Sequence, residues 1–358
     1  MDYILKEILE EPEAVKASIQ EGKASYRKVA ERLLASGCDR IYAVGCGSSY
    51  FTGILARYAL ERFAKIPTIP ATAVDFYTYS LDTVDRKSAV IAISQSGESF
   101  ETIDAARKAK GRSGLTIGLT NNAESRLAGI SDEVLLTAAG PERASGTKTV
   151  LTQMLAAYQF ALAVAQVKGT SYPRGELDRL VGELDRAVRI IQELQERLDE
   201  IKKLAGILKD VTNLYMVGAG PFFPLALQIT NTAREIAQVH AYAFEVVEFR
   251  HGPLEIIRPG STIVIINNSG CPLSDELARL AALGKRAGAS LVVATDVADK
   301  GLVALADHLF PVPATSEILG AIAYLAPFHL VLYHWAVAKG LNPNEFRNIV
   351  KTWTEKAS

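Results

Sequence analysis

Two turns in the first half of the chain combine glycine with hydroxyl side chains. The first reads GCGSS over residues 45–49, and the second reads SQSGES over residues 94–99. Each turn joins a short β-rich run to a helical pattern, so hydroxyls and unpaired backbone N–H groups gather at the positive end of a helix dipole. A phosphate suits such a turn. The candidate phosphate-binding residues are Cys46, Gly47, Ser48, Ser49, Ser94, Gln95, Ser96 and Ser99.

The phosphate is expected to belong to a small sugar. Neither turn has the lysine of the nucleotide-binding GxxxxGK[ST] loop, which favours a sugar phosphate over a nucleoside triphosphate. The third glycine of a dinucleotide-binding GxGxxG pattern would fall at Tyr50, which disfavours a nicotinamide enzyme. Serine-rich turns also serve as simple helix caps, so the turns alone leave a purely structural role open.

A polar helical stretch in the second half carries a single carboxylate. Its polar residues share one helix face: Gln228, Asn231, Thr232, Glu235 and Gln238. Solvent-facing patterns elsewhere in the chain use Lys, Arg and Glu freely, so a nearly uncharged stripe around Glu235 is more typical of a pocket wall. An ordinary, partly exposed helix would produce the same pattern, and both interpretations stay open.

A histidine and a lysine are further candidates, each weak by itself. His251 precedes Gly252 and Pro253, in a turn that ends regular structure and can present an imidazole from a loop. Lys351 lies near the C-terminus, where a lysine is usually solvated. Both residue types also occur at such positions without a function.

The elements that must position these residues come in two similar sets. Gly45 and Gly47 of the first half recur as Gly218 and Gly220 in the second. The predicted strands are RIYAVG, SAVIAIS, LTIGLT and EVLLTA in the first half and NLYMVG, STIVIIN, SLVVAT and HLFPVP in the second. Continuous apolar strands that alternate with helical patterns predict an α/β fold with parallel sheets covered on both faces.

The two halves are expected to meet near residue 172, in the stretch TSYPRGELD. The predicted organisation is an N-terminal helical segment (1–34), a first domain with the phosphate cradle (35–172), a second domain (173–340) and a C-terminal tail with Lys351 (341–358).

The composition argues against several classes of partner. The 39 basic and 40 acidic residues leave a net charge of −1, so we expect no nucleic-acid partner and no anionic membrane surface. Two apolar stretches, residues 150–167 and 318–338, contain polar residues and are expected to be buried helices rather than membrane spans. The start MDYILKEILEEPEAV is acidic and amphipathic, which disfavours export.

The cysteines indicate neither disulfides nor metal. Cys38, Cys46 and Cys271 are far apart and have neither a CxxC pattern nor metal-ligand spacing. We therefore expect no disulfide framework, no metal site and a reducing, cytoplasmic location. Since no nucleotide motif or redox centre is visible either, the predicted reaction uses no cofactor.

In order and spacing, these motifs resemble the sugar isomerase (SIS) family, and in particular the isomerase half of the glucosamine-6-phosphate synthases. The resemblance covers roughly residues 40–358 and rests on CGSS, SQSGES, Ser145 to Lys148, Arg234-Glu235-Ile236, Arg250 to Pro253, Arg347-Asn348 and Lys351. It implies two flavodoxin-like, three-layer α/β/α subdomains in tandem. It also implies that the first subdomain holds the sugar 6-phosphate and that Ser145 contacts the substrate.

The resemblance also implies chemical roles. Isomerisation of an aldose phosphate requires ring opening and transfer of a proton between C1 and C2. His251 would open the ring, Glu235 would shuttle the proton with a pKa raised by its weakly charged surroundings, and Lys351 would form an iminium with the keto sugar. In the synthases the histidine comes from the neighbouring subunit, so a homodimer with composite active sites is expected.

Two departures from the synthases shape the predicted reaction. The sequence begins with an acidic helix in place of a glutaminase domain, so we expect no use of glutamine. Thr232 stands where the synthases have a lysine one helical turn before the glutamate, so the route of proton transfer is expected to differ. The arrangement is similar to the glucosamine-6-phosphate deaminases of this family, and the predicted reaction yields fructose 6-phosphate and ammonia.

Three other functions stay open. A phosphosugar isomerase would exchange ketose and aldose without releasing ammonia, and a deglycase would release an amino acid from a fructosyl-amine 6-phosphate. A non-catalytic sugar-phosphate sensor would keep the cradle without needing Glu235 or Lys351, but we find no DNA-binding helix or basic arm. Glucosamine and galactosamine phosphates are equally compatible with the sequence, as are both directions of the reaction.

Overall fold

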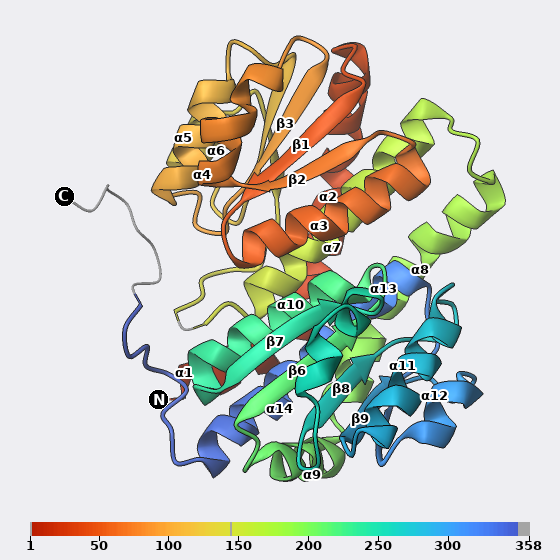
Figure 1. Cartoon of the computed structure of the whole chain (residues 1–358). Coiled ribbons are helices and arrows are strands. Elements are labelled where there is room, and N and C mark those ends of the chain that lie inside the picture. The colour runs from red at the N-terminus through yellow and green to blue at the C-terminus, as the bar shows by residue number, and fades with distance from the viewer. Residues whose placement is uncertain (1, 144, 350–358) are drawn as a thin grey trace. The chain divides into compact units, whose positions relative to one another are not determined.

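The structure is a computed structural model and describes residues 2–143 and 145–349. Contacts between residues divide the chain into two compact units. The first unit comprises mainly residues 10–142 and 146–188, and the second mainly residues 189–347 together with 1–9 and 143–145. Each unit contains one five-stranded sheet (Figure 1).

The sheet of the first unit is entirely parallel, with strand order β2-β1-β3-β4-β5. Its strands are β1 (Arg40–Gly45), β2 (Thr68–Thr72), β3 (Ser88–Ile93), β4 (Leu115–Thr120) and β5 (Glu133–Leu136). This order is that of the flavodoxin-like folds, which bind ligands at the carboxyl ends of the strands. Every residue of β3 and β4 is buried, which explains their continuous apolar sequences.

Helices cover both faces of this sheet (Figure 1). One face carries α2 (Glu11–Ala35), α3 (Ser48–Ala59) with its π-helical extension η1 (Leu60–Ala64), and α7 (Lys148–Lys168). The other face carries α4 (Ala73–Asp75), α5 (Phe100–Ala109) and α6 (Arg126–Ile130), with the short turns η2 (Phe76–Ser80) and η3 (Leu81–Thr83) after α4. Helix α8 (Arg174–Gln195) leads out of this unit.

The second unit repeats the same arrangement. Its parallel sheet has the order β7-β6-β8-β9-β10, the equivalent of the order in the first unit. The strands are β6 (Asn213–Gly218), β7 (His240–Glu245), β8 (Thr262–Ile266), β9 (Ser290–Thr295) and β10 (His308–Pro311). The predicted tandem of flavodoxin-like α/β subdomains is therefore confirmed.

The helices of the second unit also form two layers (Figure 1). One layer contains α9 (Leu198–Leu208), α10 (Phe222–Thr232) with its π-helical extension η4 (Ala233–Ala237), α13 (Glu317–Ala323) and α14 (Leu325–Ala338), against which α1 (Tyr3–Leu9) packs. The other contains α11 (Ser274–Arg286) and α12 (Lys300–Leu305). Two 3-10 turns, η5 (Glu248–Arg250) and η6 (Pro253–Ile256), lie between β7 and β8.

Two helical stretches are long and apolar enough to cross a membrane, namely Lys148–Lys168 and Glu317–Ala338. In both, most of the apolar window is buried inside the protein, 83% in the first and 94% in the second. As predicted, they are core helices.

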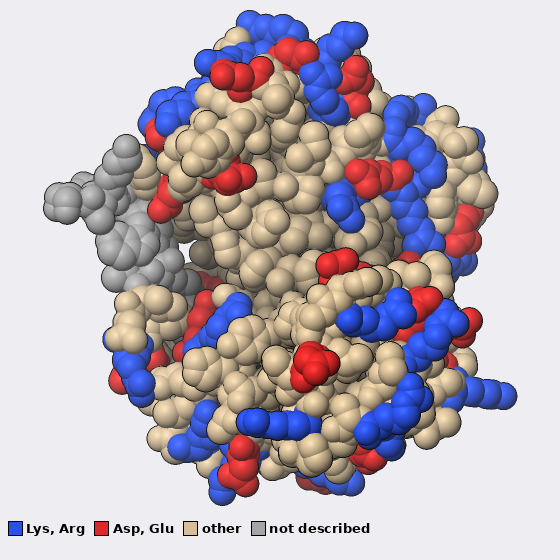
Figure 2. Space-filling model, viewed as in Figure 1, with Lys and Arg blue, Asp and Glu red and all other residues tan. Residues whose placement is uncertain are grey.

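Charged side chains of both signs are interspersed over the face of the molecule shown in Figure 2. On this face, Lys and Arg do not gather into one field, in keeping with the net charge of −1.

Candidate functional site

The β1–α3 turn of the first unit forms one half of the predicted cradle. A Cβ added to Gly45 would lie 2.8 Å from the Cβ of Ser49 and 3.0 Å from the carbonyl oxygen of Ile93, so glycine is needed for this close approach of strand and helix. Gly47 has a φ of +53°, and a Cβ there would meet nothing within 4 Å. The turn therefore leaves open space beside Gly47, where Ser48 begins α3.

The β3–α5 loop forms the other half of the cradle. Ser94 Oγ accepts a hydrogen bond from the backbone N–H of Gly97 (3.2 Å) and lies 3.1 Å from Ser99 Oγ, to which it donates. Ser96 Oγ accepts from the backbone N–H of Glu98 (3.1 Å). Ser99 is the N-cap residue of α5, so the positive end of this helix dipole follows directly after the loop.

Gly97 allows the loop to turn sharply. Its φ is +68°, and a Cβ there would lie 2.1 Å from Ser125 Oγ and 2.9 Å from Thr120 Oγ1. Its carbonyl oxygen accepts a hydrogen bond from the backbone N–H of Leu127 (3.0 Å). Any side chain at position 97 would therefore displace the loop or the start of α6.

The carboxylate within the loop, Glu98, is paired with an arginine. Glu98 Oε2 lies 2.5 Å from Arg126 Nε, and Glu98 Oε1 accepts from the backbone N–H of Arg126 (2.9 Å). Burial by itself would raise the pKa of Glu98, but the bonds to Arg126 outweigh burial and hold this pKa below its usual value. The pair balances the one negative charge of the loop, so this charge does not repel an anion bound there.

Cys46 and Gln95 complete the predicted lining. Gln95 is half-buried, and its carbonyl oxygen is held by Thr120 Oγ1 (3.2 Å). Cys46 is exposed as a residue, yet burial of its sulfur and the charge of Glu101 raise the pKa of its thiol. The thiol therefore stays protonated near neutral pH and is a neutral lining group rather than a nucleophile.

Gln153 contacts the cradle, which we did not predict from the sequence. Ser49 Oγ lies 3.3 Å from Gln153 Oε1, and the glutamine is 1% exposed. The signal in the sequence was a polar residue that breaks an otherwise apolar helix. That signal shows that a residue is unusual but does not identify its partner.

Glu235 lies at the centre of a small hydrogen-bonded group in the second unit. Ser145 Oγ donates to Glu235 Oε2, and Asn231 Nδ2 donates to Glu235 Oε1 at 2.7 Å. Ser145 is buried, whereas Asn231 and Glu235 are half-buried. Two donors from separate segments fix the orientation of a carboxylate that is still partly accessible, which suits a group that transfers protons.

The π-helical turn under Glu235 belongs to the repeated scaffold. Such turns are frequent at functional sites, but η1 is the same turn at the equivalent place in the first unit and has Arg62 where η4 has Glu235. Both turns end in a left-handed residue, Lys65 (φ +54°) and Gln238 (φ +51°). The feature particular to the second unit is therefore the carboxylate itself.

The residues of the predicted polar stripe differ in how deeply they are buried. Gln228 and Thr232 are buried, and Gln228 Nε2 donates to Thr232 Oγ1 (3.1 Å). Asn231 and Glu235 are more accessible and bond to each other. A neutral, internally bonded pair thus occupies the helical turn before the glutamate.

Of the two remaining predicted catalytic residues, the structure describes only His251. His251 lies on an exposed turn between η5 and η6, and its backbone N–H donates to the carbonyl oxygen of Glu248 (3.1 Å). The contacts around Ser145, Asn231 and Glu235 just given do not involve its ring. Lys351 lies outside the described residues.

The carboxyl edge of the second sheet carries internal anions instead of a cradle. Glu317 is 7% exposed, and its Oε1 would lie 3.0 Å from a Cβ on Gly220, the counterpart of Gly47. Asp296 Oδ2 accepts from the backbone N–H of Ser269 (2.7 Å). Burial, together with the charge of Glu317, raises the pKa of Cys271 to about 12. The described part of the chain has no group of three or more His, Cys, Asp or Glu side chains placed to hold a metal ion.

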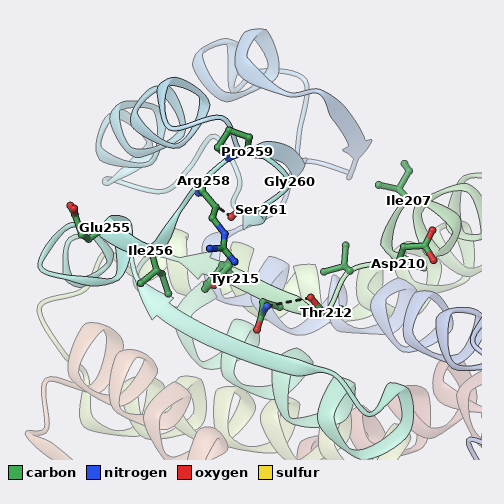
Figure 3. Close-up of a pocket in the computed structure, with 12 residues that line it drawn as sticks. Ile207, Asp210, Thr212, Tyr215, Glu255, Ile256, Arg258, Pro259, Gly260 and Ser261 are labelled. Carbon is green, nitrogen blue, oxygen red and sulfur yellow. Dashed lines mark hydrogen bonds between the residues drawn. The ribbon is translucent and has the colours of Figure 1, made fainter.

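A separate cavity of about 750 Å³ lies at the amino edge of the second sheet. Its lining includes Asn213 at the start of β6 and Ser261 just before β8, and Figure 3 shows Arg258 reaching over it toward Tyr215. None of the site residues predicted from the sequence is among its lining residues. The cavity and the phosphate cradle are therefore distinct features.

Comparison with protein families finds the SIS domain twice, over residues 35–163 and 207–339. A curated relative, the glutamine–fructose-6-phosphate aminotransferase (isomerizing) of Pyrococcus horikoshii, is 33% identical over 354 residues, which are 98% of this chain and 57% of the relative. The corresponding protein of Thermococcus kodakarensis is 32% identical over 353 residues, 98% of this chain and 58% of the relative. The chain thus spans somewhat more than half the length of these relatives.

Solved structures share the fold. The C-terminal domain of glucosamine-fructose-6-phosphate aminotransferase from Francisella tularensis superposes with a TM-score of 0.88 at 28% identity, over 95% of this chain and 96% of that one. A glucosamine-6-phosphate deaminase from Thermotoga maritima superposes with a TM-score of 0.71 at 23% identity, over 95% and 99%. At that lower identity, the second likeness concerns the fold alone.

Proposed function

Because the chain belongs to the SIS domain family, whose model matches both halves of it, we propose that it converts glucosamine 6-phosphate and water to fructose 6-phosphate and ammonia. The relatives at about one-third identity are named as isomerizing aminotransferases of fructose 6-phosphate, which supports a phosphorylated hexose as substrate. Their names describe proteins considerably longer than the matched region, so the activity of this chain is our proposal.

In this proposal the cradle of the first unit binds the 6-phosphate. Hydroxyls of Ser49, Ser96 and Ser99 supply donors, and the positive end of the α5 dipole adds to them. Ser94 holds the loop by its bonds to Gly97 and Ser99, and the charge of Glu98 is matched by Arg126. Phosphate binding far from the reacting carbons positions the sugar, so its loss should act mainly through KM.

Glu235 performs the proton transfer. In the open-chain aminosugar it takes the proton from C2 and returns it to C1. The aldehyde oxygen gains a proton and the amine loses one, so that C1 becomes a CH2OH group and C2 an imine. Water then adds to C2 and ammonia leaves, which gives the ketose phosphate. The observation that carries this role is the carboxylate held by Ser145 and Asn231 in a half-buried position.

His251 and Lys351 keep the roles that the family resemblance implies. His251 would move the proton that opens the ring, and its exposed turn makes the imidazole accessible. Lys351 would form an iminium with the keto sugar. The homodimer with composite active sites likewise remains part of the proposal.

Thr232 favours a second candidate, an aldose–ketose phosphosugar isomerase without nitrogen chemistry. The buried Gln228–Thr232 pair is neutral, so it offers no ammonium group beside the carboxylate. Proton transfer between C1 and C2 needs only the cradle, a base and a group that opens the ring. The two candidates differ in whether nitrogen is released.

The test is to incubate the protein with glucosamine 6-phosphate and to follow ammonia and fructose 6-phosphate together. Equal amounts of both, absent in the Glu235→Gln variant, are the expected result. If no ammonia forms, fructose 6-phosphate should be tested for exchange of its C1 proton with solvent, which is the mark of the second candidate. If neither reaction occurs, both candidates are wrong.

A further inference from the structure

The Ser49–Gln153 contact contains a buried polar atom without a partner. Gln153 is 1% exposed and Ser49 is 8% exposed, and the hydroxyl lies 3.3 Å from the amide oxygen Oε1. The amide nitrogen Nε2 of Gln153 is buried and has no hydrogen-bond partner among the described residues. A buried, unpaired N–H group is costly, so its retention needs a reason.

The equivalent contact of the second unit is apolar. Phe222 takes the place of Ser49 when Gly45 is matched to Gly218, and Tyr324 takes the place of Gln153 when the helix ends at Gly169 and Gly340 are matched. The rings of Phe222 and Tyr324 stack with their centroids 6.0 Å apart. The scaffold is therefore compatible with an apolar pair at this position, and packing alone does not require the polar one.

The direction of the Ser49 hydroxyl decides what it can bind. A serine has one proton and two lone pairs, so a hydroxyl that donates to Gln153 Oε1 presents only lone pairs to a ligand. Lone pairs repel a phosphate oxygen. Amide oxygen and nitrogen have nearly the same shape, and a half-turn of the carboxamide brings Nε2 to the serine, where it donates to Oγ and frees the hydroxyl proton.

We propose that Gln153 is a positioning residue whose amide N–H donates to Ser49 and thereby directs the Ser49 hydroxyl proton toward the phosphate of the substrate. After the half-turn, the unpaired group is the carbonyl oxygen of Gln153 instead of its amide N–H. A buried carbonyl oxygen without a partner is less rare in proteins than a buried N–H without one. This inference rests on the proposed function, because it takes the cradle to be the phosphate site. It extends that function by explaining what determines the direction of the Ser49 hydroxyl proton.

The test is a double-mutant cycle on the binding of fructose 6-phosphate, followed by calorimetry. Ser49→Ala should raise Kd about tenfold, since a hydrogen bond to a charged group is lost. Gln153→Met, of similar volume, should raise Kd by about the same factor, and the double variant should be no weaker than either single one. The kcat of Gln153→Met should stay within about twofold of wild type, because the loss concerns binding.

Gln153→Glu covers the case in which the methionine variant does not fold. A carboxylate only accepts, so it should draw the Ser49 proton away from the ligand and raise Kd by more than the methionine does. Unchanged Kd in both variants, or a double variant with the two losses multiplied, would overturn the role of Gln153. If wild-type protein binds no fructose 6-phosphate, the proposed function fails as well.

Discussion

The two sheets present the same glycine turn at their carboxyl edges, but the groups beside the turn differ. Gly47 and Gly220 share a φ of +53°. Beside Gly47 the space is open, whereas beside Gly220 a Cβ would approach the carboxylate of Glu317 to 3.0 Å. In the second unit the N–H of Ser269 is also already bonded to Asp296. The turn of the first unit therefore has space for an external anion, whereas carboxylates of the protein itself lie at the carboxyl edge of the second sheet.

This difference indicates how a duplicated scaffold divides its roles. The backbone features recur in both units, including the π-helical turns that end in Lys65 and Gln238. The chemical groups differ between the units: the hydroxyl-rich turns are in the first unit, and the oriented carboxylate Glu235 is in the second. Glu235 also lies far from the Gly220 turn: at a rise of about 1.5 Å per residue, the helix between them is about 20 Å long.

The largest effect is expected at Glu235. Glu235→Gln keeps the shape and the hydrogen bond from Ser145 but removes the base, so kcat should fall about a thousandfold while the Kd for fructose 6-phosphate changes little. The matched control is Arg62→Gln at the equivalent turn of the first unit, which should leave kcat near wild type. Steady-state kinetics of both variants make the comparison, and full activity in Glu235→Gln would remove the carboxylate from the mechanism.

Gly97 and Gly270 are equivalent when Gly45 is matched to Gly218, and they form a second pair for comparison. Gly97→Ala forces a side chain into a left-handed residue and to within 2.1 Å of Ser125 Oγ, so Kd for fructose 6-phosphate should rise at least tenfold and the protein should lose about 1–3 kcal/mol of stability. At Gly270 the nearest atom to a Cβ is 3.4 Å away, and Gly270→Ala should change stability by less than about 0.5 kcal/mol. Urea unfolding and calorimetry report both quantities. Equal tolerance at the two glycines would contradict the distinction.

Ser94 and Asn267 are equivalent when Gly45 is matched to Gly218, and their substitution should affect different properties. Ser94→Ala should weaken sugar-phosphate binding about tenfold with a small loss of stability. Asn267 is fully buried and donates to Asp299 (2.7 Å), so Asn267→Ala should cost about 2–3 kcal/mol of unfolding free energy and leave Kd unchanged. A change of Kd in Asn267→Ala would show that the second edge takes part in binding.

The smallest effect concerns a pair that both units share. Lys285 bonds Asp307 at 2.8 Å and lowers the pKa of that carboxyl, and Lys110 lies 3.3 Å from Asp132. A carboxyl with a lowered folded pKa stabilises the protein above its unfolded pKa near 3.9, and the contribution disappears as the pH falls through the lower folded value.

Because both carboxylates are 37% exposed, Asp307→Asn and Asp132→Asn should each cost only about 0.5–1 kcal/mol at pH 7. Urea unfolding at pH 7 and below pH 4 should show that this difference from wild type shrinks in acid. An equal difference at both pH values would mean that the pair acts through packing rather than charge.

The sequence predicts eight of the ten described strands, including the edge strands β5 and β10, but misses the opposite edge strands β2 and β7. Strands such as β3 are buried on both faces and read as unbroken apolar runs. We did not predict β2, which contains Pro70, or β7, in which exposed and buried residues alternate at the start. The residues of the proposed cradle are nearly contiguous within two turns, so the sequence alone can suggest them as one site.

The surroundings of Glu235 depend on contacts between distant residues. Ser145 lies 90 residues before Glu235, and we expected it to contact the substrate rather than the carboxylate. The polar stripe predicted one helix face, yet the chain leaves α-helical geometry at Ala233, where the π-helical turn begins. Periodicity describes a regular helix, so it does not reveal where an extra residue enters a turn.

The most direct test of the division between the two units is the number of sugar phosphates that each chain binds. Fructose 6-phosphate titrated into the wild-type protein in a calorimeter should bind with a stoichiometry of one per chain, and Ser94→Ala should weaken that binding. A stoichiometry of two, or a single site that is unaffected by Ser94→Ala and weakened by Asn267→Ala, would contradict the assignment of the phosphate to the first unit.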